Sequence, residues 1–334
     1  MPEGLGAWVL LHAVVAAAGT WLARHYALAR RLVDQPGERR SHGTATPRGG
    51  GAGIVLATLV AVIALIARVP SHAPALALAM AGLLAVAGAG WIDDHRPLSP
   101  WLRLGVHALA GVLLALAVVV SGGGLAQALM AIAAAMVLVN VWNFMDGIDG
   151  IACTQAALVA IAYAATASDV VVQWLGWALA AACLGFLPFN FPKATVFLGD
   201  VGSGGLGYLV AALLVMGFDA APASAWALLP LSAFLLDAAL TLGTRMVRGE
   251  QWWTPHVGHL YQRLARSWNR HTWVTVCYAA WTVCAICLLW LLRAWEPAAI
   301  MYAVLAWYLA GAVIWKLAKG LLERGRHVDK DIVR

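Results

Sequence analysis

The chain has 334 residues, of which 62% are hydrophobic and only 11% are charged, and its mean hydropathy is +0.79. Soluble domains carry charged side chains at roughly twice this frequency, so the composition excludes an ordinary soluble protein. The formal net charge is +6. Because the basic residues flank apolar runs, we interpret this charge as a signal of membrane topology and expect no nucleic-acid partner.

Apolar runs long enough to cross a hydrocarbon core of about 30 Å recur along the chain. They predict an all-α, polytopic integral membrane protein with about eleven transmembrane helices. The first run has no Ala-x-Ala-like cleavage site behind it and is expected to be retained. The predicted spans are residues 6–24, 51–67, 74–91, 104–120, 125–142, 151–167, 170–187, 204–217, 223–243, 273–291 and 298–315.

Lysine and arginine are distributed unevenly over the connections between these spans. One side receives 20 of the 22 basic residues, and the other receives only Arg68 and Arg293. The positive-inside rule makes the richer side cytoplasmic, so the amino terminus is expected to be periplasmic and the carboxyl terminus cytoplasmic. We expect a single transmembrane catalytic domain over residues 1–315, followed by a cytoplasmic, amphipathic and basic tail over residues 316–334.

Five polar segments interrupt the apolar pattern, and all lie on the predicted cytoplasmic side: residues 38–53, 93–103, 143–150, 190–207 and 245–271. Each leads into a span that starts at the cytoplasm, so five positive helix N-termini should converge on one face. The segments 49–51, 146–150 and 199–205 are glycine-rich. We interpret these as turns whose backbone N–H groups cradle phosphate oxygens. The alternative is that glycine serves tight turns and close helix packing.

Carboxylates are scarce in this chain, yet several gather in these segments. Asp93 and Asp94 stand at the inward end of a span, where the helix dipole is negative and adjacent carboxylates repel each other. Two other inward loops supply Asn143, Asp146, Asp149 and Asp200. Hard oxygen ligands favour Mg²⁺ or Mn²⁺, so the cluster predicts a metal and phosphate site. The alternative for the Asp93-Asp94 pair is a solvated acidic helix end.

The largest inward loop contains His256 and His259, followed by Arg263, Arg266 and Arg270. These side chains suit phosphate contact. A basic loop lying on an anionic leaflet is an equal alternative.

Asp237 lies inside the ninth predicted span, where acidic residues are functional candidates. Arg245 follows eight residues later, near the same helical face. We therefore expect structural pairing or a water-lined cleft in preference to catalysis.

The motifs together resemble one family. They are Ser41-His42, Thr46-Pro47-Arg48-Gly49-Gly50-Gly51, Asp93-Asp94, Asn143-x-x-Asp146-Gly147-Ile148-Asp149-Gly150, Asn190, Phe197-Leu198-Gly199-Asp200-Val201-Gly202-Ser203 and Pro255-His256-Val257-Gly258-His259. In this order, over essentially the whole chain, they resemble the polyprenyl-phosphate N-acetylhexosamine-1-phosphate transferases of glycosyltransferase family 4 type. That group contains bacterial initiators of O-antigen and teichoic-acid synthesis and the phospho-MurNAc-pentapeptide translocase.

The resemblance implies transfer of N-acetylhexosamine 1-phosphate, with GlcNAc-1-phosphate expected, from a UDP-sugar to undecaprenyl phosphate, with release of UMP. The expected setting is initiation of cell-envelope polysaccharide at the cytoplasmic face of the bacterial inner membrane. The family pattern also allows a homodimer. The chain lacks the lysine that many members carry before the first Thr-Pro, and Arg48 is the expected substitute.

The resemblance also assigns roles to single residues. It implies that Asp200 ligates Mg²⁺ and that Asp93 and Asp94 serve the lipid phosphate or the metal. It also implies nucleotide contact by Gly147, Asp149 and Asn190, and stacking of Phe197 on uracil. Asp146 is expected near the sugar diphosphate, and Arg48 and Asn143 are expected to bind substrate. His256 and His259 are expected to contact phosphate or sugar. Direct attack by the lipid phosphate, with Asp93 as base, and an aspartyl-phosphate intermediate both stay open.

Two other classes are weighed against this one. A CDP-alcohol phosphotransferase would need Asp-Gly-x-x-Ala-Arg, whereas Gly150 here leads into Ile-Ala-Cys-Thr-Gln. A transporter would carry deep charges and broken helices near the midplane, whereas Asp237 is the single deep acid in the predicted spans.

Overall fold

The computed structural model describes residues 4–35, 45–218, 222–251, 254 and 256–332, with only the backbone for residues 222–223 and 325–332. Eleven helices follow the predicted apolar runs: α1 (Leu5–Ala29), α2 (Ala52–Arg68), α3 (Ala73–His95), α4 (Pro100–Val120), α5 (Leu125–Met145), α6 (Ile151–Thr166), α7 (Val170–Asn190), α8 (Gly199–Gly217), α9 (Ser232–Val247), α11 (His271–Leu292) and α12 (Pro297–Ile332). The expected all-α class is confirmed.

The remaining elements are short. The 3₁₀ helix η1 (Pro70–His72) precedes α3, and a second one, η2 (Pro222–Leu231), leads into α9. Helix α10 (Leu260–Trp268) lies in the large polar loop. The strands β1 (Val33–Asp34) and β2 (Thr46–Pro47) pair antiparallel, with Asp34 opposite Thr46.

Within the described residues, nine helices are long and apolar enough to cross a membrane, and the chain is a multi-pass membrane protein. Helices α2 and α6 have only 17 and 16 residues. At 1.5 Å per residue each spans about 25 Å, less than a typical hydrocarbon core of about 30 Å. The count of eleven spans therefore stays a prediction. The orientation, with a periplasmic amino terminus and a cytoplasmic carboxyl terminus, also stays a prediction.

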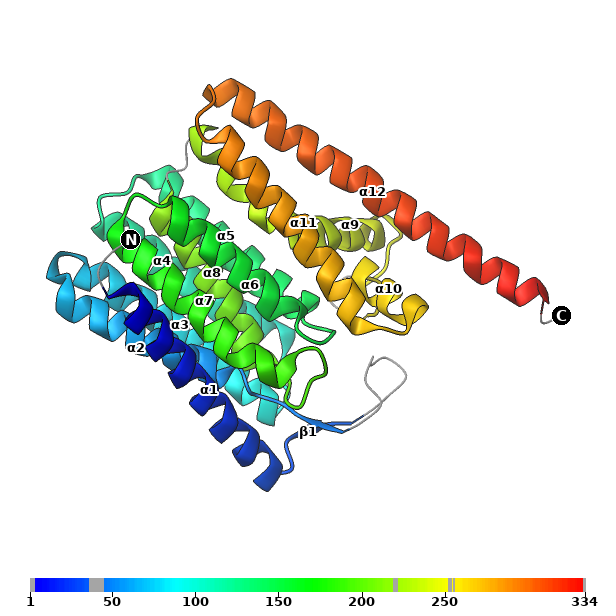
Figure 1. Cartoon of the computed structure of the whole chain (residues 1–334), viewed down its shortest axis with the longest axis horizontal. Helices are drawn as coiled ribbons and strands as arrows, with labels where there is room; N and C mark the ends of the chain where they lie inside the picture. Colours follow the sequence, from blue (N-terminus) through cyan, green and yellow to red (C-terminus); the bar gives the residue numbers. More distant parts are fainter. Residues whose placement is uncertain (1–3, 36–44, 219–221, 252–253, 255, 333–334) are drawn as a thin grey trace.

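Helix α8 forms the centre of the larger part of the bundle, where it packs against α2, α3, α5 and α6 (Figure 1). Its glycine-rich first turns allow this close approach, because small residues let membrane helices pack backbone against backbone. A Cβ atom on Gly51, at the start of α2, would lie 2.3 Å from the Cα atom of Gly202 in α8. The two helix N-termini are thereby held together at one end of the bundle.

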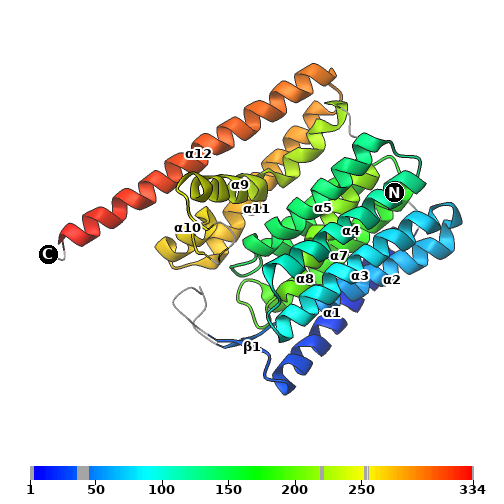
Figure 2. The same ribbon diagram turned by 180° about the vertical axis from the view of Figure 1, so that it is seen from behind.

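Helices α9, α11 and α12, with η2, pack together beside this bundle. Helix α12 continues without a break to Ile332, and its last turns extend beyond the other helices (Figure 2). The boundary expected at residue 315 is therefore not a helix end. The location of residues 316–334 on the inner leaflet stays a prediction.

Candidate active site

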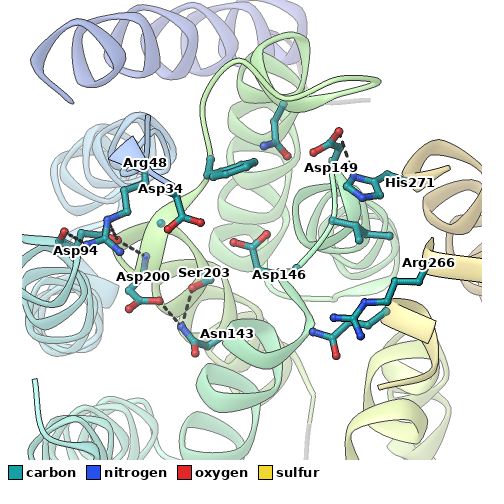
Figure 3. Close-up of a pocket in the computed structure, with 16 residues that line it drawn as sticks. Asp34, Arg48, Asp94, Asn143, Asp146, Asp149, Asp200, Ser203, Arg266 and His271 are labelled. Atoms are coloured by element: carbon teal, nitrogen blue, oxygen red, sulfur yellow. Dashed lines mark hydrogen bonds and ion pairs between the residues drawn. The ribbon is translucent and has the colours of Figure 1, made fainter. Parts of the chain in front are cut away.

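A cavity of about 460 Å³ opens at the end of the bundle where α8 begins. Nine of the predicted site residues line it: Arg48, Asp94, Asn143, Asp146, Gly147, Asp149, Asn190, Phe197 and Asp200. Figure 3 shows carboxylates of four different segments directed at one space, with Asp146 between the Asp94 and Asp200 side and the Asp149 side. Segments distant in sequence thus converge as the motif order predicted.

Asp94 joins α3 to the N-terminus of α8. Its two carboxylate oxygens accept hydrogen bonds from the backbone N–H groups of Asp200, at 3.1 Å, and Val201, at 3.2 Å. Backbone N–H groups in the first turn of a helix lack partners within the helix, so this buried carboxylate caps α8 from another helix. Arg48 pairs with Asp94 at 3.9 Å and also donates to its backbone carbonyl.

Asp200 lies in the first turn of α8 and faces the cavity. The amide of Asn143 donates to Asp200 Oδ1 at 2.7 Å and to Ser203 Oγ at 3.1 Å. Arg103 lies 3.9 Å from Asp200 Oδ2. These contacts fix the orientation of the Asp200 carboxylate toward the cavity.

Asp93 lies beside the cavity and does not line it. Arg103 donates to Asp93 Oδ2 at 3.0 Å, and the Leu98 N–H donates to Oδ1. One oxygen is thus engaged with the turn that connects α3 to α4, and the other with the start of α4. A role for Asp93 as base stays a prediction, and these contacts compete with it.

Asp146 follows the last turn of α5 and points into the cavity (Figure 3). Burial, together with the negative charges of Asp200, Asp94 and Asp149, raises the pKa of Asp146 to about 8. Like charges close together disfavour ionisation in this way. The cavity is therefore a site where a bound cation would relieve repulsion.

Asp149 anchors the opposite wall. Its carboxylate lies 3.3 Å from His271 Nδ1, and its backbone carbonyl accepts from Thr275 Oγ1 at 2.8 Å. Both partners belong to the first turns of α11. The loop before α6 is thereby fixed to α11.

The interpretation of the glycine turns as phosphate cradles is wrong for the N–H groups of Gly50, Gly51 and Gly150, and it stays a prediction for the other N–H groups of these turns. The N–H groups of Gly50 and Gly51 donate to the carbonyls of Phe197 and Leu198 at 2.9 Å. The N–H of Gly150 donates to Asn190 Oδ1 at 2.9 Å. Since these donors already have backbone or amide acceptors, the alternative of close packing holds at these three positions. The Asn190 amide also donates to the Val196 carbonyl, at 2.9 Å. Its side chain therefore already makes two hydrogen bonds, and the predicted nucleotide contact would have to form beside them.

His256 and His259 do not line the cavity. The two rings stack with centroids 4.9 Å apart. Burial, followed by the nearby His259 and Arg245, lowers the pKa of His256 to about 4, so His256 is neutral at physiological pH. The predicted phosphate or sugar contact of both histidines stays a prediction. Pro255, which begins the histidine motif, and the separate Ser41-His42 motif lie outside the described residues.

Of the two alternatives expected for Asp237, pairing with Arg245 is wrong, and a water-lined cleft stays a prediction. Arg245 instead lies 3.4 Å from Glu250. Asp237 is 1% exposed and accepts hydrogen bonds from α10, α11 and α12, as described below. The expectation of a structural role, in preference to catalysis, agrees with these contacts.

Four further polar residues line the cavity but were not among the predicted site residues: Asp34, Ser203, Gln262 and His271. Arg266, which the sequence grouped with other basic residues of its loop, also lines it. Asp34 belongs to β1 and is brought in by its pairing with β2. Asp34 is one of two acidic residues in a strongly basic inward loop, and this was the available signal for it.

A hard divalent cation fits this donor set. No three His, Cys, Asp or Glu side chains in the described part of the chain form a complete metal site. Mg²⁺, however, is commonly held by one or two carboxylates and completed by water and substrate phosphates. Asp200 and Asp94 match such a partial site. A cation bound to them would also offset the negative charge that raises the pKa of Asp146.

Comparison with known proteins agrees with the motifs. Residues 75–218 match the model of glycosyl transferase family 4. The decaprenyl-phosphate N-acetylglucosaminephosphotransferase of Mycobacterium tuberculosis (strain ATCC 25618 / H37Rv) is 30% identical over 306 residues, covering 76% of this chain and 74% of that protein. The chain belongs to glycosyl transferase family 4.

Other members of glycosyl transferase family 4 are similarly related. A protein of Bacillus subtilis (strain 168), named probable undecaprenyl-phosphate N-acetylglucosaminyl 1-phosphate transferase, is 25% identical, with 73% of each chain covered. The phospho-N-acetylmuramoyl-pentapeptide-transferase of Heliobacterium modesticaldum is 27% identical over 65% of this chain and 75% of its own. The family model spans α3 to α8, the helices that carry most of the cavity carboxylates.

Proposed function

We propose that this membrane protein transfers N-acetylhexosamine 1-phosphate from a UDP-sugar to undecaprenyl phosphate and releases UMP. The sugar is N-acetylglucosamine or a related N-acetylhexosamine. The reaction initiates a cell-envelope polysaccharide such as O-antigen, at the cytoplasmic face of the bacterial inner membrane. One observation carries the proposal: a carboxylate-lined cavity at the end of a membrane bundle, built from the motifs of this family.

The relatives support the choice of substrates. Their names describe N-acetylglucosamine phosphate transfer to decaprenyl or undecaprenyl phosphate. A lipid phosphate and a cytosolic sugar nucleotide can meet only at a membrane boundary. A cavity at the end of a helix bundle meets this requirement.

The reaction exchanges one diphosphate bond for another. An oxygen of the lipid phosphate attacks the β-phosphorus of the UDP-sugar, and the bond from that phosphorus to the oxygen of UMP breaks. The bond between the sugar C1 and its oxygen stays intact. The lipid phosphate is already anionic at neutral pH, so the protein mainly has to orient the two substrates and offset their charge.

The residues divide this work by position. Asp200, fixed by Asn143, and Asp94 would hold Mg²⁺ or Mn²⁺, which neutralises charge on diphosphate oxygens when bound. Phe197, Gly147 and Asp149 are the proposed nucleotide contacts. Asp146 lies between the two groups and faces the proposed diphosphate position.

The proposal is tested with purified protein in nanodiscs, Mg²⁺, undecaprenyl phosphate and a panel of sugar nucleotides. The expected result is UMP formation with one or more UDP-N-acetylhexosamines and none without the lipid. A CDP-alcohol enzyme would react only with cytidine donors, and a transporter would release no nucleotide. UDP as the product, or turnover only with CDP-linked donors, would overturn the proposal.

A further inference from the structure

Arg266 is distinctive among the basic side chains around the cavity. Arg48 is paired with Asp94, and His271 with Asp149. Arg266 lines the cavity and is exposed, and it has no ion-pair partner in the described part of the chain. In Figure 3 its side chain extends from α10 toward the middle of the cavity, across from Asp94 and Asp200. An unpaired guanidinium facing a cavity is a suitable binder for phosphate oxygens.

The neighbouring Arg263 on the same helix behaves differently. Arg263 Nη1 donates to Glu323 Oε1 of α12 at 2.8 Å, and Arg263 does not line the cavity. The rotation of α10 about its own axis therefore decides which arginine meets the substrates. Whatever fixes α10 also fixes Arg266.

Asp237 fixes α10 from α9. Its carboxylate accepts hydrogen bonds from the backbone N–H groups of Leu260, at 2.8 Å, and Tyr261, at 3.1 Å. It also accepts from Tyr278 of α11 at 2.8 Å and from Trp315 of α12 at 3.1 Å. A buried carboxylate at the positive end of a helix stabilises that end, and here the same group joins four helices.

Tyr261 carries this constraint to the cavity. Its hydroxyl donates to the backbone carbonyl of Phe144 at 2.9 Å, two residues before Asp146. A Cβ atom on Gly147 would lie 2.2 Å from that hydroxyl, so α10 rests directly on the loop that carries Asp146. Burial raises the pKa of Tyr261, with Asp237 adding to the effect, and the phenol stays a donor.

We propose that Arg266 binds a phosphate group of a substrate, and that Asp237 is the positioning residue that sets α10 so that Arg266 reaches the cavity. This rests on the proposed function of the same site. The phosphate belongs either to the diphosphate of the sugar nucleotide or to the polyprenyl phosphate, since both carry oxygens of the same chemistry.

The test measures initial rates in nanodiscs while each substrate is varied separately. Arg266→Gln should raise KM for one substrate by roughly 10- to 100-fold, the effect of losing a charge-assisted hydrogen bond, with a much smaller change in kcat. Arg266→Lys keeps the charge without the planar fork and should restore part of the affinity. Arg263→Gln is the matched control and should leave both KM values unchanged.

The substrate whose KM rises identifies the source of the phosphate. Unchanged KM values for both substrates in Arg266→Gln would overturn the role of Arg266. Equilibrium binding of UDP-N-acetylglucosamine and of undecaprenyl phosphate is measured in parallel. If the wild type binds a ligand through Arg266 but forms no UMP, the proposed reaction fails while the anion site stands.

Asp237→Asn replaces one acceptor oxygen by an amide that faces backbone N–H donors. It should raise KM for the same substrate as Arg266→Gln, and the double variant should be no worse than Arg266→Gln alone, because both act through one contact. A wild-type KM in a folded Asp237→Asn protein would overturn the positioning role. If that variant fails to fold, Tyr261→Phe, which removes only the bond to Phe144, decides by the same measurement.

Discussion

The carboxylate of Asp94 in α3 accepts a hydrogen bond of 3.1 Å from the backbone N–H of Asp200 in α8. The proposed metal ligand and its neighbour in the site are thus joined through the end of a helix. The cap of α8 and the proposed metal site therefore share the carboxylate of Asp94.

Asp94→Ala should therefore lower both stability and activity. Loss of the carboxylate leaves the N–H groups of Asp200 and Val201 without their acceptor, at a cost of about 1–3 kcal/mol. Activity should fall by more than about tenfold, because a barrier increase of about 1.4 kcal/mol already has that effect. The control is Ser99→Ala, which removes the cap of α4 at a residue that does not line the cavity. Equal relative losses of activity in the two variants would contradict a catalytic place for Asp94.

Asp200→Asn should abolish turnover that depends on Mg²⁺ and leave the protein folded in the membrane. The change keeps the shape of the side chain and removes the charge that would hold the cation. Ser203→Ala, which removes only the second acceptor of Asn143, is the matched control and should keep most of the activity. Retention of more than about a tenth of the wild-type rate in Asp200→Asn would make Asp200 a structural residue, since loss of a metal ligand should raise the barrier by several kcal/mol.

Much of this site follows from local sequence. The apolar runs set the helix positions, and residues 143–150 and 199–203 lie at helix ends that meet in the cavity. The role of α10 does not follow in this way. Arg263 and Arg266 are equivalent in the sequence, and their orientation is set by Asp237, a distant residue on another helix. The pairing of Arg245 with Glu250 and the acceptors of the Gly50, Gly51 and Gly150 N–H groups also depend on tertiary contacts.

Asp146 should make the stability of the protein depend on pH. Its pKa is about 8 in the folded state, against an ordinary value of 3.8, so the folded state holds this proton more tightly than the unfolded chain. Its contribution to stability is full below about pH 4 and is lost as the pH rises to about 8. Asp146→Asn removes this loss. In chelator, the melting temperature of the variant relative to wild type should therefore increase from about pH 5 to about pH 8, and a constant difference would contradict the shifted pKa.

The predicted orientation can be tested by thiol labelling in intact cells. Ser267 lies in the last turn of α10 within the basic loop, whereas Ser121 ends α4 at the opposite end of that helix from the Asp93-Asp94 turn. In a background without the native cysteines, Ser121→Cys should react with an impermeant maleimide and Ser267→Cys should be shielded. Comparable labelling at both positions would reject the orientation, and labelling after permeabilisation controls for buried thiols.

The central claim concerns which bond breaks, and a doubly labelled donor tests it most directly. UDP-N-acetylglucosamine with ³²P in the β-phosphate and ¹⁴C in the sugar is incubated with the protein, Mg²⁺ and undecaprenyl phosphate, and the lipid fraction is extracted. Phospho-sugar transfer predicts that both labels enter the lipid in equal molar amounts and that added UMP returns both to the donor. Sugar label in the lipid without the β-phosphate label would mean that the C1–O bond was cut, and would contradict the account.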